Sequence, residues 1–405
     1  MISDVELSVR NGAELLDRLL KDIVSENSSF EIKPFILLLQ NRLKCKNPAV
    51  LLFLLSWISF LDSIPGFDLI QYLPAFFDGL LNILTDSNNQ EISTLCKNCL
   101  NDFLKSFSST QLSKDDLKAL LATIIVHLKS PIDTVRSLSL EFLIEFSSIS
   151  KETIFNETSL ILSCVLPSLG SNEFHIRQLA IKANNLISLI YTEFGAEKEA
   201  KDLVKMIIDE IRNENEATRV VALDWLLLIQ KKSVNTNFIL DNDSFHALLK
   251  ALVISSSEEV IQRDLRLLAQ ISLSSDDESL RSFISNLLII LSQDTALLER
   301  RGNLIFRQLC IALTPEKLFA TIAQILEDEK DLIFASLIVQ YLNIILLTTN
   351  ETKPLRTKLR NLDNRENQNL FYTLYKSWCH NPISVITLCL LSQSYDHASL
   401  LVLQM

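Results

Sequence analysis

Residues 47–84, NPAVLLFLLSWISFLDSIPGFDLIQYLPAFFDGLLNIL, predict two apolar helices separated by one break. The first helix is expected to begin at Asn47-Pro48, because asparagine is a good N-cap and proline is tolerated in the first helical turn. Ile64-Pro65-Gly66 is expected to end it, since proline lacks a backbone donor and glycine permits a sharp turn. Both helices are apolar on more than one face, so both must be covered on two sides, as in the middle of a stacked array.

The composition indicates an all-helical chain. Its 405 residues are 48% hydrophobic, which is too much for one compact core, since such cores stop growing near about 250–300 residues. The chain has only 6 glycines and 9 prolines, and no Pro/Gly/Ser-rich linker precedes about residue 350. A β-rich fold would need turn glycines and alternating apolar positions, and neither pattern is visible.

The charge and the cysteines limit the partners and the compartment. The net charge is −11, whereas nucleic-acid binders usually carry a basic stripe, so we expect no nucleic-acid partner. No run of 18 apolar residues occurs, so a membrane location is expected to come indirectly through partners. Seven cysteines with no signal peptide before them predict reduced thiols in the cytoplasm.

A repeat of about 42 residues runs through most of the chain. In each unit one helix ends, a short polar turn follows, and a second helix starts with a small aliphatic or similar residue in its first turn. The matched positions are Val50, Ile92, Val135, Ile176, Thr218, Val260, Leu298 and Ile333, with spacings of 42, 43, 41, 42, 42, 38 and 35. Two helices per period near 40 are the signature of HEAT or armadillo repeats.

These observations predict the fold class and the domains. We expect an all-α, HEAT/armadillo-like α-solenoid of stacked helix pairs over residues 1–349. Residues 350–405 are predicted to be the beginning of a helical C-terminal module. The helix pairs are expected to turn near Lys46, Ser87, Ser130, Gly170, Asn213 and Ser256.

Charged residues recur at these turns. We interpret them as a structural ladder of exposed ion pairs, each worth about 0–1 kcal/mol. The pairs are Asp133 with Arg136, Glu173 with Arg177, and Glu216 with Arg219. A local basic run in the C-terminal module is interpreted as a solvated face or linker, with an anionic partner or lipid headgroup as the alternative. It comprises Lys353, Arg356, Lys358, Arg360 and Arg365.

Motifs of enzyme chemistry are missing from the sequence. Glycine-rich phosphate loops, a G-x-S-x-G elbow and H-E-x-x-H do not occur. Cys96-x-x-Cys99 lacks a second ligand pair, so buried structural thiols are favoured over a zinc site. We therefore predict no catalytic residue, no metal site, no cofactor and no enzyme activity.

Five segments resemble one known family. They are NGAELLDRLLKDIV (11–24), SWISFLDSIP (56–65), YLPAFFDGL (72–80), IFRQLC (305–310) and NLFYTLYKSWCHNP (369–382). These residues resemble the Vac-fourteen family, the HEAT-repeat scaffold of the endosomal and vacuolar complex that makes and turns over phosphatidylinositol 3,5-bisphosphate.

The resemblance implies a non-catalytic scaffold on endosome and vacuole (lysosome) membranes. Its implied partners are a FYVE-type phosphatidylinositol-3-phosphate 5-kinase, a Sac-domain polyphosphoinositide 5-phosphatase and further copies of the scaffold. The kinase is tied to the amino-terminal repeats, and the phosphatase and self-association to the C-terminal module. From the repeats alone, a different HEAT-repeat adaptor, such as a phosphatase scaffold or a transport receptor, stays open.

The predicted partner-binding residues form one corner: Ser377, Trp378, Cys379, His380, Asn381 and Pro382. Pro382 disfavours the helical conformation at Asn381 and so should break the helix there. Trp378 beside polar His380 and Asn381 has the composition of a binding hot spot, with His380 expected to act in binding and not in stability. The alternative is that Trp378 and Cys379 pack inward and only lock the corner.

Overall fold

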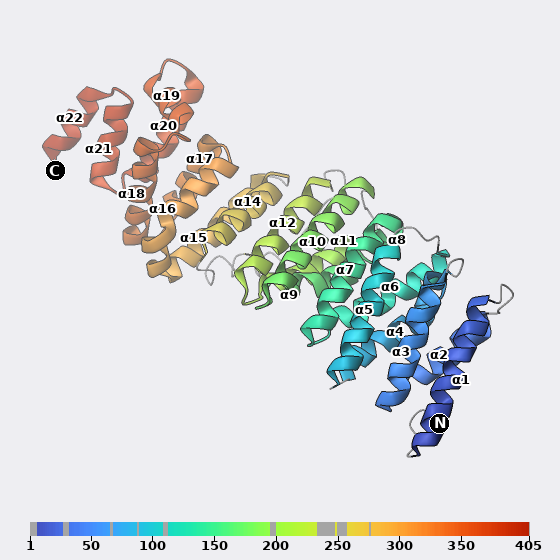
Figure 1. The fold of residues 1–405 in the computed structure, drawn as a ribbon. Helices are drawn as coiled ribbons and strands as arrows, with labels where there is room; N and C mark the ends of the chain where they lie inside the picture. The colour runs from blue at the N-terminus through green and yellow to red at the C-terminus, as the bar shows by residue number, and fades with distance from the viewer. Residues whose placement is uncertain are drawn as a thin grey trace. The chain divides into compact units, whose positions relative to one another are not determined.

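The computed structural model describes residues 6–26, 32–64, 68–86, 89–107, 112–194, 200–232, 248, 257–274 and 277–404. Every regular element in these ranges is a helix, and none of them contains a strand. The chain divides into two compact units, residues 1–196 and 197–405 (Figure 1). The all-α prediction is confirmed.

The helices of the first unit are α1 (Leu7–Glu26), α2 (Ile32–Leu43), α3 (Pro48–Asp62), the 3-10 helix η1 (Leu69–Tyr72), α4 (Leu73–Asp86), α5 (Gln90–Phe107), α6 (Lys114–Leu128), α7 (Asp133–Ile149), α8 (Lys151–Asn156), α9 (Thr158–Ser168) and α10 (Phe174–Phe194). Those described in the second unit are α11 (Ala200–Ile211), α12 (Glu216–Lys232), α14 (Glu258–Ser274), α15 (Asp277–Gln293), α16 (Thr295–Ala312), α17 (Pro315–Glu327), α18 (Leu332–Thr348), α19 (Lys353–Arg360), α20 (Arg365–Trp378), α21 (Pro382–Leu391) and α22 (Tyr395–Gln404).

Within each unit the helices stack as pairs. In the first unit α2, α4, α6 and α9 pack in succession, and so do their pair partners α3, α5, α7 and α10. In the second unit α12, α14, α16, α18 and α21 pack in succession, while α15, α17 and α20 do the same (Figure 1). This is the predicted α-solenoid of stacked helix pairs. The stacking continues through α20 and α21, and the predicted boundary at residue 349 stays a prediction.

The repeat positions found in the sequence fall in the first turn of the second helix of each pair. Ile92, Val135, Ile176, Thr218 and Val260 are each the third residue of their helix, and all five are buried. Leu298 is also buried, one residue later in α16, and Val50 is half-buried in α3. An aliphatic or methyl-bearing side chain at this position therefore fixes each second helix against its neighbours.

Ile333 is the exception, and its predicted place in the core is wrong. Its side chain is 83% exposed, and the next residue, Phe334, is buried instead. The Asp331 side chain caps α18 by accepting from the backbone N–H groups of Ile333 and Phe334 at 3.0 and 3.1 Å. This cap makes Ile333 the second residue of the helix, so the register of the repeat shifts by one.

Helix starts and turns follow the local sequence signals. The Asn47 side chain accepts from the Ala49 N–H at 3.0 Å, and Pro48 is the first residue of α3, as predicted. The predicted turns at Lys46, Ser130, Gly170 and Asn213 lie between paired helices. The predicted break at Pro65-Gly66 and the turns at Ser87 and Ser256 lie outside the described residues.

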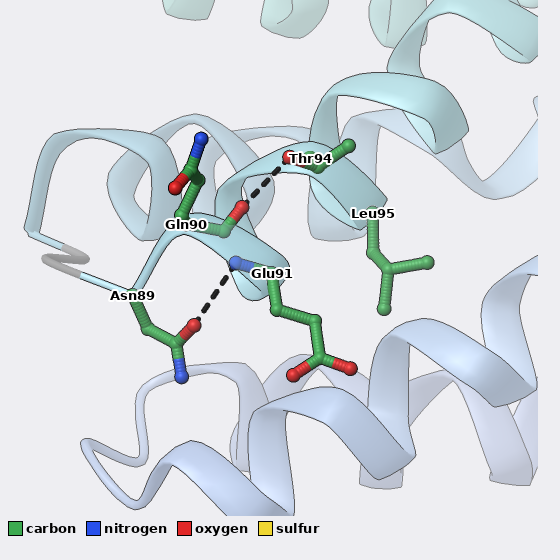
Figure 2. Close-up of a pocket in the computed structure, with 5 residues that line it drawn as sticks. All are labelled: Asn89, Gln90, Glu91, Thr94 and Leu95. Carbon is green, nitrogen blue, oxygen red and sulfur yellow. Dashed lines mark hydrogen bonds between the residues drawn. The ribbon is translucent and has the colours of Figure 1, made fainter.

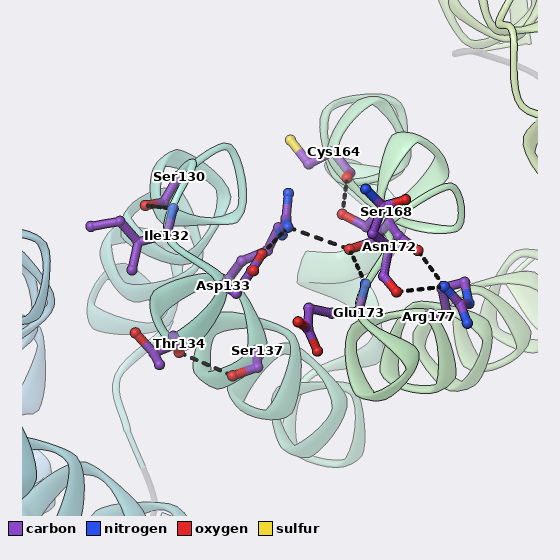
Figure 3. A network of polar contacts seen from close by, with 12 residues as sticks. Ser130, Ile132, Asp133, Thr134, Ser137, Cys164, Ser168, Asn172, Glu173 and Arg177 are labelled. Atoms are coloured by element: carbon purple, nitrogen blue, oxygen red, sulfur yellow. Dashed lines mark hydrogen bonds and ion pairs between the residues drawn. The ribbon is translucent and has the colours of Figure 1, made fainter.

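The polar ladder at the turns exists, but its pairing differs from the prediction (Figure 3). Arg136 pairs with Asp133 as expected and also reaches the Ser171 hydroxyl of the next turn at 3.4 Å. Arg177 donates to the carbonyl oxygens of Ser171 and Asn172 at 2.6 and 2.9 Å, not to Glu173. Glu216 accepts from the Ser257 hydroxyl. Uncapped carbonyls and hydroxyls at the turns therefore compete with carboxylates for these side chains.

Val135→Asp and Ile176→Asp should each destabilise the first unit by several kcal/mol, because an unpaired charge enters an apolar stack between neighbouring repeats. Ile333→Asp, at the aligned but exposed position, is the control and should change stability by no more than about 0.5 kcal/mol. Thermal and urea unfolding followed by circular dichroism measures these effects. Equal midpoints for all three variants would show that the inner face is misplaced.

Candidate functional site

The predicted corner Ser377–Pro382 is the turn from α20 to α21, and its largest side chain faces inward. Trp378 is fully buried, with its ring centroid 6.1 Å from that of Phe319 on α17. The expectation that Trp378 is a surface anchor is therefore wrong, because the stacking of α20 on α17 covers the indole. The alternative interpretation holds for Trp378 but not for Cys379, which is exposed.

The polar residues of the corner hold the turn together. His380 Nε2 donates to the Leu326 carbonyl oxygen at the end of α17, at 3.1 Å. Asn381 caps α21 by accepting from the Ser384 N–H at 3.0 Å, and its amide donates to the Ser336 hydroxyl of α18 at 3.2 Å. Ser377 is buried and donates to the Leu374 carbonyl at 3.0 Å. The fold thus uses these polar groups for its own packing.

The exposed part of the corner consists of Cys379, Pro382 and the following residue, Ile383, which is 74% exposed. The sequence analysis missed Ile383, because it placed the apolar contact before the break. One signal in the sequence could have found it: a bulky isoleucine directly after a proline at the first position of a helix, where the backbone faces solvent.

The basic run is divided between the fold and the surface. Arg356 donates to the carbonyl oxygens of Leu346 and Thr349 at 2.6 and 2.7 Å and so caps the end of α18. Lys358 pairs with Glu316 of α17 at 2.6 Å. Lys353, Arg360 and Arg365 are exposed and are the members of the run that face solvent. An anionic ligand would therefore meet three cations and not five.

Reactive groups are poorly placed for catalysis. Among the described residues, no three His, Cys, Asp or Glu side chains are grouped so as to hold a metal ion. Burial raises the pKa of the Cys96 and Cys99 thiols and raises the pKa of Cys310 to about 12, so these thiols stay protonated and are weak nucleophiles.

A depression of about 610 Å³ beside the start of α5 is lined by Asn89, Gln90, Glu91, Thr94 and Leu95 (Figure 2). Its hydrogen bonds serve the helix, because Asn89 Oδ1 accepts from the Glu91 N–H at 2.9 Å and the Thr94 hydroxyl donates to the Gln90 carbonyl at 2.7 Å. An apolar groove of about 340 Å³ lies between α1, α2 and α3, with Arg42 as its one charged lining residue. Neither site brings an acid and a base together.

Within the described part of the chain, no single helix is both long and apolar enough to cross a membrane. The helices α18 and α19 together meet the length and composition criteria, but they are bent by 93° relative to each other.

One buried acid stands apart from this description. Asp264 on α14 is fully buried, and neither carboxyl oxygen has a hydrogen-bond partner among the described residues. Burial raises the pKa of Asp264 well above its ordinary value of 3.8. The residue therefore weakens the second unit at neutral pH.

Comparison with known proteins adds a family match over the region of the corner. The matching family model describes the C-terminal, phosphatase-binding region of vacuolar protein 14. It matches residues 295–405, which run from the start of α16 past α22. We call it the C-terminal family model.

Curated relatives match nearly the whole chain. The chain is 36% identical to "Protein VAC14 homolog" of Arabidopsis thaliana, over 99% of this chain and 53% of that protein. It is 33% identical to "Protein VAC14 homolog" of Schizosaccharomyces pombe, over 98% of this chain and 61% of that protein. It is 28% identical to "Vacuole morphology and inheritance protein 14" of Saccharomyces cerevisiae, over 98% of this chain and 61% of that protein. The chain spans about half to three-fifths of the length of these relatives.

Among solved structures, a crystal structure of importin beta is similar at 12% identity and a TM-score of 0.34, covering 98% of this chain and 53% of that chain.

His380→Ala should lower the free energy of unfolding of the second unit by about 0.5–1.5 kcal/mol, because the Leu326 carbonyl loses its donor. This corrects the expectation that His380 serves binding without stability. The measurement is urea unfolding of the intact chain, with Cys379→Ser as the exposed control. A midpoint equal to that of the wild type would argue against the contact.

Asp264→Asn should stabilise the second unit at pH 7 by about 1–3 kcal/mol, because the amide carries no charge into the core. A raised folded-state pKa means that the folded state binds more protons than the unfolded state, so wild-type stability falls as pH rises from about 4 toward that pKa. The gain should therefore shrink as the pH is lowered toward 4. Unfolding curves of both proteins between pH 4 and pH 8 test this, and a difference that does not change with pH contradicts it.

Proposed function

We propose a scaffold function for this chain, which belongs to the Vac14 family of the relatives that match it over 98–99% of its length. In this proposal the chain holds a Sac-domain polyphosphoinositide 5-phosphatase and a FYVE-type phosphatidylinositol-3-phosphate 5-kinase. It thereby controls synthesis and turnover of phosphatidylinositol 3,5-bisphosphate. The chain itself performs no chemical step.

One observation carries the proposal. The match to the C-terminal family model covers α16 to α22, a part of the second unit made of stacked helix pairs with exposed turns. The partner named by that model is a Sac-domain phosphatase, so the match supports the phosphatase as the partner of this region. It also favours this function over that of other HEAT-repeat adaptors.

The physics of stacked repeats suits such a role. Each repeat adds one turn and one helix face to the surface without needing a new core, so binding sites multiply along the chain. Two enzymes held on one chain meet at an effective concentration set by their attachment points, not by their bulk concentrations. Opposing kinase and phosphatase activities can then be balanced at one place.

The location and the remaining partners complete the proposal. The name of the Saccharomyces cerevisiae relative refers to vacuole morphology and inheritance, which supports action at the vacuole. We place the chain in the cytoplasm, peripheral to endosome and vacuole membranes and attached through its partners. The amino-terminal repeats contact the kinase, and the C-terminal module, including Ser377–Pro382, serves the phosphatase and self-association.

The test uses the purified 405-residue chain with a purified Sac-domain phosphatase. We expect saturable binding in a titration followed by calorimetry, and none with an unrelated α-solenoid such as importin beta. The chain alone, given phosphatidylinositol 3-phosphate with ATP or phosphatidylinositol 3,5-bisphosphate, should transfer and release no phosphate. Absence of phosphatase binding, or turnover by the chain alone, contradicts the proposal.

A further inference from the structure

The second residue of the second helix in each described pair shows a pattern. In seven of these helices this residue is alanine or polar: Ala49, Glu91, Thr134, His175, Ala217, Glu259 and Ala296. In the last two, α18 and α21, it is Ile333 and Ile383. The change occurs within the residues matched by the C-terminal family model.

Both isoleucines face solvent. Ile333 is 83% exposed and Ile383 is 74% exposed, and each follows another exposed apolar residue, Leu332 and Pro382. Single exposed apolar residues are common, but bulky ones at the same position of two adjacent repeats form a patch. We call Leu332, Ile333, Pro382 and Ile383 the isoleucine ridge.

Three contacts place the two halves of the ridge next to each other. Asn381 at the start of α21 donates to Ser336 of α18 at 3.2 Å, and His380 donates to the Leu326 carbonyl at 3.1 Å. Lys376 lies 3.5 Å from Glu327. Packed helices lie about 8–10 Å apart, so the two isoleucines are about one helix spacing apart. Two side chains seven residues apart on a helix have about the same separation, roughly 10.5 Å.

The border of the ridge is acidic. The turn from α17 to α18 carries Asp328, Glu329 and Asp331 against one lysine, Lys330. Asp328 and Asp331 are exposed. A ligand that covers the isoleucines therefore meets negative charge at its edge, and a basic residue there would be favoured.

We propose that the isoleucine ridge binds a segment of the Sac-domain phosphatase that presents two apolar side chains about 10 Å apart beside a lysine or arginine. The inference rests on the proposed function and names the surface through which it acts. It assigns the ridge to the phosphatase because the change to isoleucine lies inside the matched region and because its acidic border selects a basic segment. The buried Trp378 supports this surface from beneath by fixing α20 on α17.

The test compares variants of the 405-residue chain in titrations with the purified phosphatase. The double variant Ile333→Ser with Ile383→Ser should bind at least about tenfold more weakly, since two apolar side chains lose their contact. Asp328→Lys should also weaken binding, and its effect should shrink at high salt. Ile311→Ser on α16, where the side chain is 57% exposed within the same matched region, is the matched control and should bind within about twofold of the wild type.

The outcomes separate the inference from the proposed function. If the wild type binds the phosphatase and the double variant binds equally well, the ridge is not the contact while the scaffold function stands. If the wild type does not bind, both fail. Loss of self-association with unchanged phosphatase binding assigns the ridge to a second copy and overturns the inference. If the double variant shows a lowered unfolding midpoint, Asp328→Lys decides alone.

Discussion

A helix that is apolar on two faces can be stable in water only when neighbours cover both faces, and this constraint organises the chain. In α3 the side chains of Leu55, Ile58 and Leu61 are fully buried, although the helix contributes only part of their surroundings. Packing from α5 and α2 supplies the rest. No helix pair is complete without the next one, so stacking is the condition for stability and not a consequence of it.

The same constraint explains how much of the structure the sequence predicts. The repeat spacing located the buried residue at the start of α5, α7, α10, α12 and α14, because a fixed spacing of two-helix units keeps this position on the inner face. It failed at Ile333, where the spacing had shortened and the Asp331 cap moved the helix start. Spacing measures the distance between repeats, but the cap decides which residue begins the helix.

Side-chain partners were harder to predict than positions. Arg177 found backbone carbonyls and not Glu173, and Trp378 lies under α17, since both outcomes depend on the path of a neighbouring repeat that the local sequence does not record. The burial of Asp264 is likewise invisible in the sequence, where an acid within an amphipathic helix suggests a solvated face. At the candidate site, the sequence predicted the corner correctly as a helix break, but it named the buried residues and missed exposed Ile383.

These results divide the second unit into residues that build the stack and residues that are free of it. The corner from α20 to α21 spends Ser377, Trp378, His380 and Asn381 on packing and capping, which leaves Cys379, Pro382 and Ile383 at the surface. A rigid turn that presents a few exposed apolar side chains suits a protein that binds others and catalyses nothing. The central claim is that one chain holds two opposing enzymes at once. Its most direct measurement is the mass, by light scattering after size-exclusion chromatography, of the species formed from the chain, the FYVE-type kinase and the Sac-domain phosphatase. The account predicts one species that contains all three proteins, and mutually exclusive binding of the two enzymes would contradict it.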